Sequence, residues 1–338
     1  MAIRKALSAL LLSAVSCAPP PETKTDSAGS YLDFRTPGDV QAGGVRMIEL
    51  QEGYRVWTKR FGNAPMKVLL LHGGPAATHE YMECFESFFP QAGIEFYEYD
   101  QLGSYYSDQP QDQSLWTTER FVEEVEQVRK ALGLEKDNFY LLGNSWGGLL
   151  AMEYALKYQD NLKGLIVANM TGDFGKYAAY NAKLRAELPA EVLAKLAEFE
   201  SKGAYTDPAY QEMVVREYYG RHICTLPEWP EPAARSFKHI NQSVYAYMQG
   251  PSEFVPGGIL KDWSVWDRLG DIRVPTLMVG AAHDTMNPAE MEEMSRLVQK
   301  GRYLFCPNGS HLAMWDDQEV FMGGVIGFIK DVHQGRFP

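Results

Sequence analysis

Runs of apolar residues separated by turn-forming residues follow one another along most of this chain. Two short runs, at residues 45–50 and 54–60, flank Glu52-Gly53 and predict a hairpin of two strands. Continuous apolar runs are typical of strands that are buried on both faces. Such runs predict further strands at residues 66–71, 94–99, 139–142, 162–168, 276–280 and 302–305.

Helical periodicity appears between several of these strands. Residues 118–132 place Phe121 and Val125 on one face of a helix and Glu124 on the opposite face. A second helix is expected at about residues 146–157. Strands that alternate with helices predict an α/β fold, with a mostly parallel central sheet covered by helices on both faces.

The alternation stops between residues 171 and 263. This stretch is rich in Tyr, Trp, Pro and helix-forming residues, and no strand of the alternating pattern falls within it. We therefore expect a helical cap over residues 171–263, inserted into a core domain made of residues 31–170 and 264–338.

The first residues are typical of an exported protein. Two basic residues precede an apolar run, residues 6–15, that is too short to span a bilayer. The run leads into Ala-Val-Ser-Cys, which resembles the lipobox of bacterial lipoproteins and makes Cys17 a candidate lipidation site. We expect a signal peptide over residues 1–17, a flexible tether over residues 18–30, and a lipoprotein anchored to a bacterial membrane. A cleaved signal with a periplasmic or secreted product is the alternative.

Composition limits the partners of the protein. Its 338 residues are 45% hydrophobic and 22% charged, which is ordinary for a globular protein, and the formal net charge is −12. We expect no nucleic-acid partner because the sequence has no cluster of Lys and Arg. The acidic balance favours solubility or, alternatively, reflects a pocket that selects amines. Apart from Cys17, three cysteines remain, which allow at most one disulfide within the chain.

A Gly-x-Ser-x-Gly motif carries the strongest chemical signal. Residues 143–147 read Gly-Asn-Ser-Trp-Gly between a predicted strand and a predicted helix. In that context the serine lies on a tight turn, where small neighbours avoid steric clashes and the hydroxyl is presented as a nucleophile. Ser145 is therefore the candidate nucleophile. The alternative is a serine that only caps the following helix.

Partners for this serine follow late in the chain. A nucleophilic serine needs a base, and the base needs a carboxylate that orients it, here in the chain order Ser, Asp or Glu, His. Asp284 follows the strand at 276–280 and His311 follows the next strand, so both are expected at the same edge of the sheet. His283 is the main rival base, although adjacent residues on a loop point in different directions.

Two backbone N–H groups are candidates for the oxyanion hole, the donors that stabilise the negative oxygen formed during acyl transfer. Trp146 follows the nucleophile, and Gly74 lies in the His-Gly-Gly-Pro loop after the strand at 66–71. A plain turn is the alternative for the glycine loop. No set of His and carboxylate residues has metal-ligand spacing, so we expect neither a metal ion nor another cofactor.

Together these motifs resemble the proline iminopeptidase family, α/β-hydrolases with a helical cap that remove N-terminal residues from peptides. The resemblance extends from about Asp33 to the C-terminus. It rests on His-Gly-Gly-Pro at 72–75, Asp-Gln-Leu-Gly-Ser-Tyr-Tyr-Ser at 100–107, Gly-Asn-Ser-Trp-Gly-Gly at 143–148 and the His311 loop. The family loops usually read HGGPG and DQRGxGxS, so Ala76 and Leu102 depart from the pattern, which bears more on substrate preference than on the reaction.

The resemblance implies that carboxylates of the cap hold the free α-amino group of the substrate. A buried ammonium next to the nucleophile has to be paired, and the pairing rejects peptides with a blocked N-terminus. By resemblance, Glu253 is the first candidate and Glu217 or Glu212 is the second, and the alternative is that these carboxylates are merely solvated. The candidates for the aromatic wall of a proline pocket are Tyr105, Tyr106, Trp146 and Trp229.

We therefore expect a serine aminopeptidase that releases N-terminal proline, or another small or hydrophobic residue, from short peptides or amino-acid amides. An esterase or lactonase with the same triad is the alternative enzyme. A ligand receptor of the same fold is the alternative without catalysis, and the presence of all three triad residues disfavours it.

Overall fold

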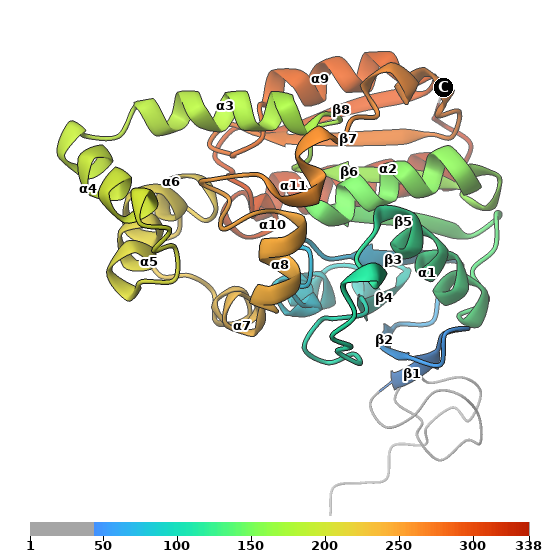
Figure 1. Ribbon diagram of the computed structural model, residues 1–338. Coiled ribbons are helices and arrows are strands. Elements are labelled where there is room, and N and C mark those ends of the chain that lie inside the picture. Colours follow the sequence, from blue (N-terminus) through green and yellow to red (C-terminus); the bar gives the residue numbers. More distant parts are fainter. Residues whose placement is uncertain (1–43, 338) are drawn as a thin grey trace, which may run out of the picture.

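The computed structural model describes residues 44–337 (Figure 1). The predicted signal peptide, the candidate lipidation site Cys17 and the predicted tether lie outside the described residues. Within residues 44–337, no helix combines the length and the apolar character that crossing a bilayer requires.

An eight-stranded sheet forms the centre of the described chain. Its strands are β1 (Val45–Glu49), β2 (Arg55–Phe61), β3 (Met66–Leu71), β4 (Ile94–Asp100), β5 (Phe139–Asn144), β6 (Gly164–Ala168), β7 (Thr276–Ala281) and β8 (Gly301–Cys306). They lie in the order β1-β2-β4-β3-β5-β6-β7-β8. The pairings of β2 with β1 and with β4 are antiparallel, and all the later pairings are parallel. The predicted strands are confirmed, with ends within two residues of the prediction.

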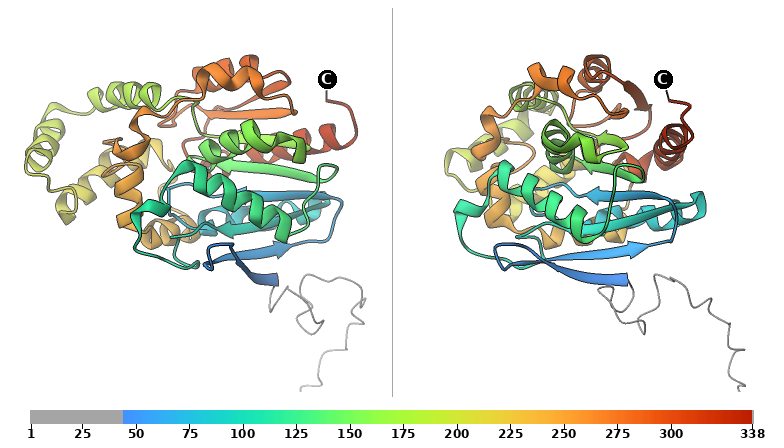
Figure 2. Two further views of the ribbon diagram at one scale, coloured as in Figure 1. Left: turned by 45° about the vertical axis from the view of Figure 1, so that its right-hand side comes forward. Right: turned by 90° about the vertical axis from the view of Figure 1, so that its right-hand side faces the viewer.

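Helices cover both faces of this sheet (Figures 1 and 2). The helices on one face are α1 (Thr118–Ala131), α2 (Trp146–Tyr158) and α9 (Pro288–Leu297). On the other face lie the 3₁₀ segment η2 (His79–Ser87), α10 (Ala313–Asp316) and α11 (Gln318–His333). Side chains alternate between the two layers: in β3, Leu69 and Leu71 join the core beneath α1 and α2, and Val68 and Leu70 join the core beneath α11.

Helix α1 shows both what the periodicity predicts and what it misses. Thr117 caps its N-terminus by accepting the N–H of Arg120 at 3.3 Å, and Phe121 is buried as predicted. The prediction that Glu124 faces solvent is wrong, because this residue is fully buried. Its carboxylate accepts the N–H of Leu102 at 2.9 Å and pairs with Arg120. A carboxylate on the buried side of the helix thus fixes the loop that follows β4.

Between β6 and β7 the chain forms a group of helices, which we call the cap helices. They are α3 (Phe174–Ala186), α4 (Ala190–Ser201), α5 (Pro208–Val214), α6 (Gly220–His222), α7 (Glu231–His239) and α8 (Gln242–Met248), and a π-helical turn (Val215–Tyr219) joins α5 to α6. Figures 1 and 2 show them gathered at one end of the sheet. Leu184, Leu196 and Tyr210 belong to an apolar cluster of their own, which packs α3, α4 and α5 together.

Candidate active site

Ser145 stands on the sharp turn between β5 and α2. Its backbone has a φ of 57° and a ψ of −129°, a strained conformation for a residue with a side chain. The flanking glycines make the turn possible. A Cβ at Gly143 would lie 1.9 Å from the carbonyl oxygen of Gly147, and a Cβ at Gly147 would lie 2.0 Å from that of Leu71. The predicted strand, serine and helix are therefore arranged as the motif requires.

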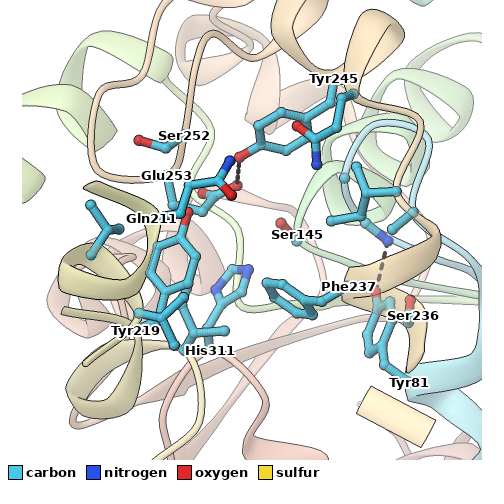
Figure 3. A pocket seen from close by; sticks show the side chains of 18 of the residues that line it. Tyr81, Ser145, Gln211, Tyr219, Ser236, Phe237, Tyr245, Ser252, Glu253 and His311 are labelled. Carbon is cyan, nitrogen blue, oxygen red and sulfur yellow. Dashed lines mark hydrogen bonds between the residues drawn. The ribbon is translucent and has the colours of Figure 1, made fainter. Parts of the chain in front are cut away.

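His311 and Asp284 meet at the same edge of the sheet, on the loops that follow β8 and β7. Nδ1 of His311 lies 2.7 Å from Oδ1 of Asp284, and Asp284 is fully buried. His311 and Ser145 line the same cavity, and Figure 3 shows both side chains facing it. With Nδ1 held by the carboxylate, Nε2 is the nitrogen left for proton exchange. The structure thus brings the three residues predicted as a triad into one site.

The charges around His311 favour its protonated form. Burial alone would lower the pKa of this imidazole, but the Asp284 carboxylate, with a smaller contribution from Glu253, raises it by more. The pKa of His311 therefore lies above the ordinary histidine value of 6.5. Stabilising the imidazolium in this way suits a base that takes a proton from a serine hydroxyl.

Asn169 belongs to this site although the sequence analysis missed it. It is the first residue after β6 and has a φ of 53°, a conformation that asparagine tolerates better than most residues. Its amide donates to Oδ2 of Asp284 at 2.7 Å and to the carbonyl of Ser310 at 3.2 Å. It therefore ties the carboxylate to the loop that carries His311. Its position could have identified it, because it is a polar residue directly after a predicted strand, at the sheet edge that carries Ser145.

Trp146 and Gly74 offer backbone N–H groups beside Ser145. The N–H of Trp146 is the first in α2, where no carbonyl of the helix can accept it. The N–H of Gly73 donates to the Tyr81 hydroxyl at 2.7 Å, whereas that of Gly74 has no hydrogen-bond partner within residues 44–337. A Cβ on Gly73 would lie 2.8 Å from the Cβ of Ser145, so the loop approaches the nucleophile closely. Neither of the two predicted oxyanion-hole donors has a hydrogen-bond partner among the residues that the structure describes.

A cavity of about 340 Å³ opens beside Ser145, between the sheet edge and the cap helices. The large apolar and aromatic residues that the cap contributes to its wall are Tyr205, Tyr210, Val214, Val215, Tyr219, Ile223, Phe237, Ile240 and Tyr245. Such a lining favours a substrate with an apolar side chain over one with a charged side chain.

The aromatic wall predicted from the sequence is wrong for this cavity. Trp146 is buried in the core and donates its indole N–H to Gln101 at 2.7 Å. Tyr105 is 52% exposed, and neither Tyr106 nor Trp229 belongs to the cavity wall. The positions of aromatic residues in the sequence do not reveal which face a cap turns toward the sheet.

Glu253 is the only carboxylate on the cavity wall within the part of the chain that the structure describes. It is 8% exposed and accepts hydrogen bonds from the hydroxyls of Tyr177 and Tyr245, the second at 2.6 Å. Burial, together with the charge of Glu253, raises the pKa of both tyrosines well above the ordinary value, so both remain donors. Figure 3 shows Glu253 across the cavity from Ser145. A buried carboxylate in this place favours a substrate that carries a positive charge.

Glu217 and Glu212 are not part of the cavity wall. Glu217 instead pairs with Arg216 at 2.8 Å and with Arg221 at 3.7 Å, and both arginines are more than half exposed, at 62% and 53%. The structure therefore does not bring the second predicted carboxylate to the site. One face of the α5 segment reaches the cavity and the other faces solvent. The local sequence does not reveal which of the two faces lines the cavity.

Other reactive residue types lie away from the nucleophile. The rival base His283 is exposed and does not line the cavity. Cys84, Cys224 and Cys306 are free and buried, and burial raises the pKa of the Cys224 thiol to about 11. Within residues 44–337, no group of three or more His, Cys, Asp and Glu side chains is placed to hold a metal ion.

Comparison with known proteins agrees with this fold and site. A family model of the alpha/beta hydrolase fold matches residues 67–318. The chain is 62% identical over 287 residues to a proline iminopeptidase of Elizabethkingia meningoseptica, covering 84% of this chain and 96% of that protein. It is 60% identical, over the same shares, to a proline iminopeptidase of Flavobacterium johnsoniae. The crystal structure of a proline iminopeptidase of Mycobacterium smegmatis superposes with a TM-score of 0.78 at 30% identity, covering 86% of this chain and 99% of that one.

Proposed function

Since this chain belongs to the proline iminopeptidase family of α/β-hydrolase-fold serine aminopeptidases, we propose that it releases N-terminal proline, or another small or hydrophobic residue, from short peptides and amino-acid amides. The observation that carries the proposal is a single cavity that holds a nucleophilic serine, its histidine and a buried carboxylate on the opposite wall. The carboxylate fits the substrate's free amine, and the apolar wall fits the first side chain.

The reaction begins at the carbonyl carbon of the first residue. Oγ of Ser145 attacks this carbon while Nε2 of His311 takes the hydroxyl proton, and Asp284 stabilises the imidazolium that results. The N–H groups of Trp146 and Gly74 donate to the negative oxygen of the tetrahedral intermediate. His311 then returns the proton to the departing amine, and the acyl group stays on the serine. Water, activated by the same imidazole, hydrolyses the ester and frees the first amino acid.

Glu253 explains why the substrate needs a free N-terminus. An α-ammonium that enters the cavity loses much of its hydration, so it binds well only beside a negative charge. Tyr177 and Tyr245 hold the two carboxylate oxygens in place through hydrogen bonds. An acetylated N-terminus has no charge to offer and leaves the carboxylate buried without a cation.

Acetylation of the substrate should therefore lower kcat/KM by about 10²-fold or more, because it removes one partner of a desolvated ion pair. The test is steady-state hydrolysis of proline, alanine and phenylalanine β-naphthylamides with free and acetylated N-termini, beside a short-chain nitrophenyl ester. Turnover of the ester is compatible with the proposal, since esters are easier to cleave. Equal rates on free and acetylated amides, or activity on the ester alone, would replace the aminopeptidase with an esterase.

The pH profile should have an acid limb that belongs to His311 and an alkaline limb that belongs to the substrate. Because the pKa of His311 is raised, kcat/KM is expected to fall with decreasing pH around a midpoint above 6.5. At high pH the substrate's α-ammonium, with a pKa of about 8, loses the charge that Glu253 binds. Measured with a free-amine and an acetylated substrate, only the first should show the alkaline limb. An acid midpoint below 6.5 would contradict the assignment of the base.

We also propose that the protein is exported and held at a bacterial membrane through lipid on Cys17. The support is the basic start, the short apolar run and the Ala-Val-Ser-Cys sequence that ends at Cys17. Replacing Cys17 by serine is expected to move the protein from the membrane fraction to the soluble fraction of fractionated cells. If the variant were distributed like the wild type, lipid attachment at Cys17 would be refuted, and the first residues would be at most an ordinary signal peptide.

A further inference from the structure

The cavity wall carries one cation in addition to the carboxylate already described. Lys238, on cap helix α7, is the only Lys or Arg lining the cavity within residues 44–337. Its side chain is exposed, and among the described residues it forms no ion pair or hydrogen bond. Glu253 is buried and lines the same cavity. The cavity therefore presents a negative charge in its interior and a free positive charge at its mouth.

Helix α7 lies on the far side of the nucleophile from Glu253. Figure 3 shows Ser236 and Phe237, the two residues before Lys238, across Ser145 from Glu253. A substrate whose α-ammonium reaches Glu253 and whose first carbonyl reaches Ser145 therefore extends its remaining residues toward α7. Lys238 lines the cavity from this helix, on the side toward which the leaving part of a peptide extends.

Buried contacts hold α7 to the core, so the backbone position of Lys238 is fixed. Glu80, which is 1% exposed, forms an ion pair with Arg235 at 2.7 Å and lies 2.8 Å from Nδ1 of His239, on the two sides of Lys238. Ser236 adds a hydrogen bond between its hydroxyl and that of Thr78 at 3.0 Å. The backbone beneath the lysine is thus anchored on both sides, and only the lysine side chain itself is free to adjust.

We propose that Lys238 binds the C-terminal carboxylate of short peptide substrates, and that the protein favours dipeptides and tripeptides with a free carboxylate over longer or amidated ones. This inference rests on the proposed function, because it takes the amine at Glu253 as the other fixed end. Each further peptide residue adds about 3.5 Å, so only the first few residues after the cleaved bond keep the carboxylate near one lysine. The spacing between Glu253 and Lys238 therefore limits the length of a substrate that can pair with both charges.

The test compares Pro-Ala and Pro-Ala-Ala with the corresponding C-terminal amides, by the release of proline. For whichever of the two peptides the wild type cleaves faster, kcat/KM with a free C-terminal carboxylate is expected to exceed kcat/KM of the corresponding amide by about fivefold. This is the effect expected of a partly exposed ion pair. Lys238→Gln should bring this ratio to about one, and Lys238→Glu should bring it below one. High salt should weaken the wild-type preference, since it screens exposed charges.

Lys195 provides a matched control, because it is an exposed lysine of cap helix α4 that does not line the cavity. Lys195→Gln makes the same change in net charge and should keep the wild-type ratio of acid to amide. A wild-type ratio near one for both lengths, or a ratio that Lys238→Gln leaves intact, overturns the inference and leaves the aminopeptidase standing. If no free-amine peptide is cleaved in either form, the proposed function fails and this inference fails with it.

Discussion

Replacing Ser145 by alanine is expected to lower kcat for a free-amine substrate by about 10⁵-fold, because the oxygen that forms the acyl-enzyme bond is lost. Alanine keeps a Cβ and nothing beyond it, so the turn between β5 and α2 has to accommodate no added atoms. The free energy of unfolding, measured with urea, should therefore stay within about 1 kcal/mol of the wild type.

A matched control for this variant is Ser201→Ala, at an exposed serine at the end of α4. It should keep the wild-type rate. If Ser145→Ala instead retained a rate within tenfold of the wild type, the nucleophile would be another group and the site would have to be reassigned.

Replacing Glu253 by glutamine is expected to lower kcat/KM for free-amine substrates by about 10³-fold, since it removes the charge that pairs with a desolvated ammonium. Glutamine has nearly the same shape and can still accept a hydrogen bond from Tyr177 or Tyr245. Acetylated substrates should lose much less, so the preference for a free N-terminus should largely disappear. The measurement is kcat/KM for one β-naphthylamide in its free and acetylated forms.

Glu217→Gln serves as the control, because Glu217 is a cap carboxylate that pairs with arginines outside the cavity. It should keep the wild-type preference for the free amine. The role of Glu253 would be refuted if Glu253→Gln kept that preference, and it would pass to Glu217 if the control variant were the one to lose it.

The strands and the triad were predictable from sequence because each depends on a local pattern. Buried parallel strands are apolar along most of their length, so β3, β5, β6 and β7 stand out as runs. Gly143 is required by a backbone contact with Gly147, within the motif that carries the serine. Asp284 and His311 follow late strands, and parallel strands bring their carboxyl ends to one edge.

The parts that were missed depend on contacts between segments far apart in the chain. Asn169 matters because its amide donates to Asp284, which lies 115 positions away in the chain. Glu124 lies on the side of α1 that the loop after β4 covers, which no helical periodicity reveals. Cap helices show the same limit, because the packing of one helix on another decides which face reaches the cavity.

The most direct test of a serine aminopeptidase with an amine-binding carboxylate is covalent labelling with a diphenyl phosphonate analogue of proline. Attack by Oγ of Ser145 on phosphorus releases phenol and leaves a stable phosphonyl ester, which intact mass and peptide mapping detect. The account predicts one label per chain, on Ser145, formed about 10²-fold faster by the analogue with a free amine than by its acetylated form. A label on another residue, or equal rates for the two forms, would contradict it.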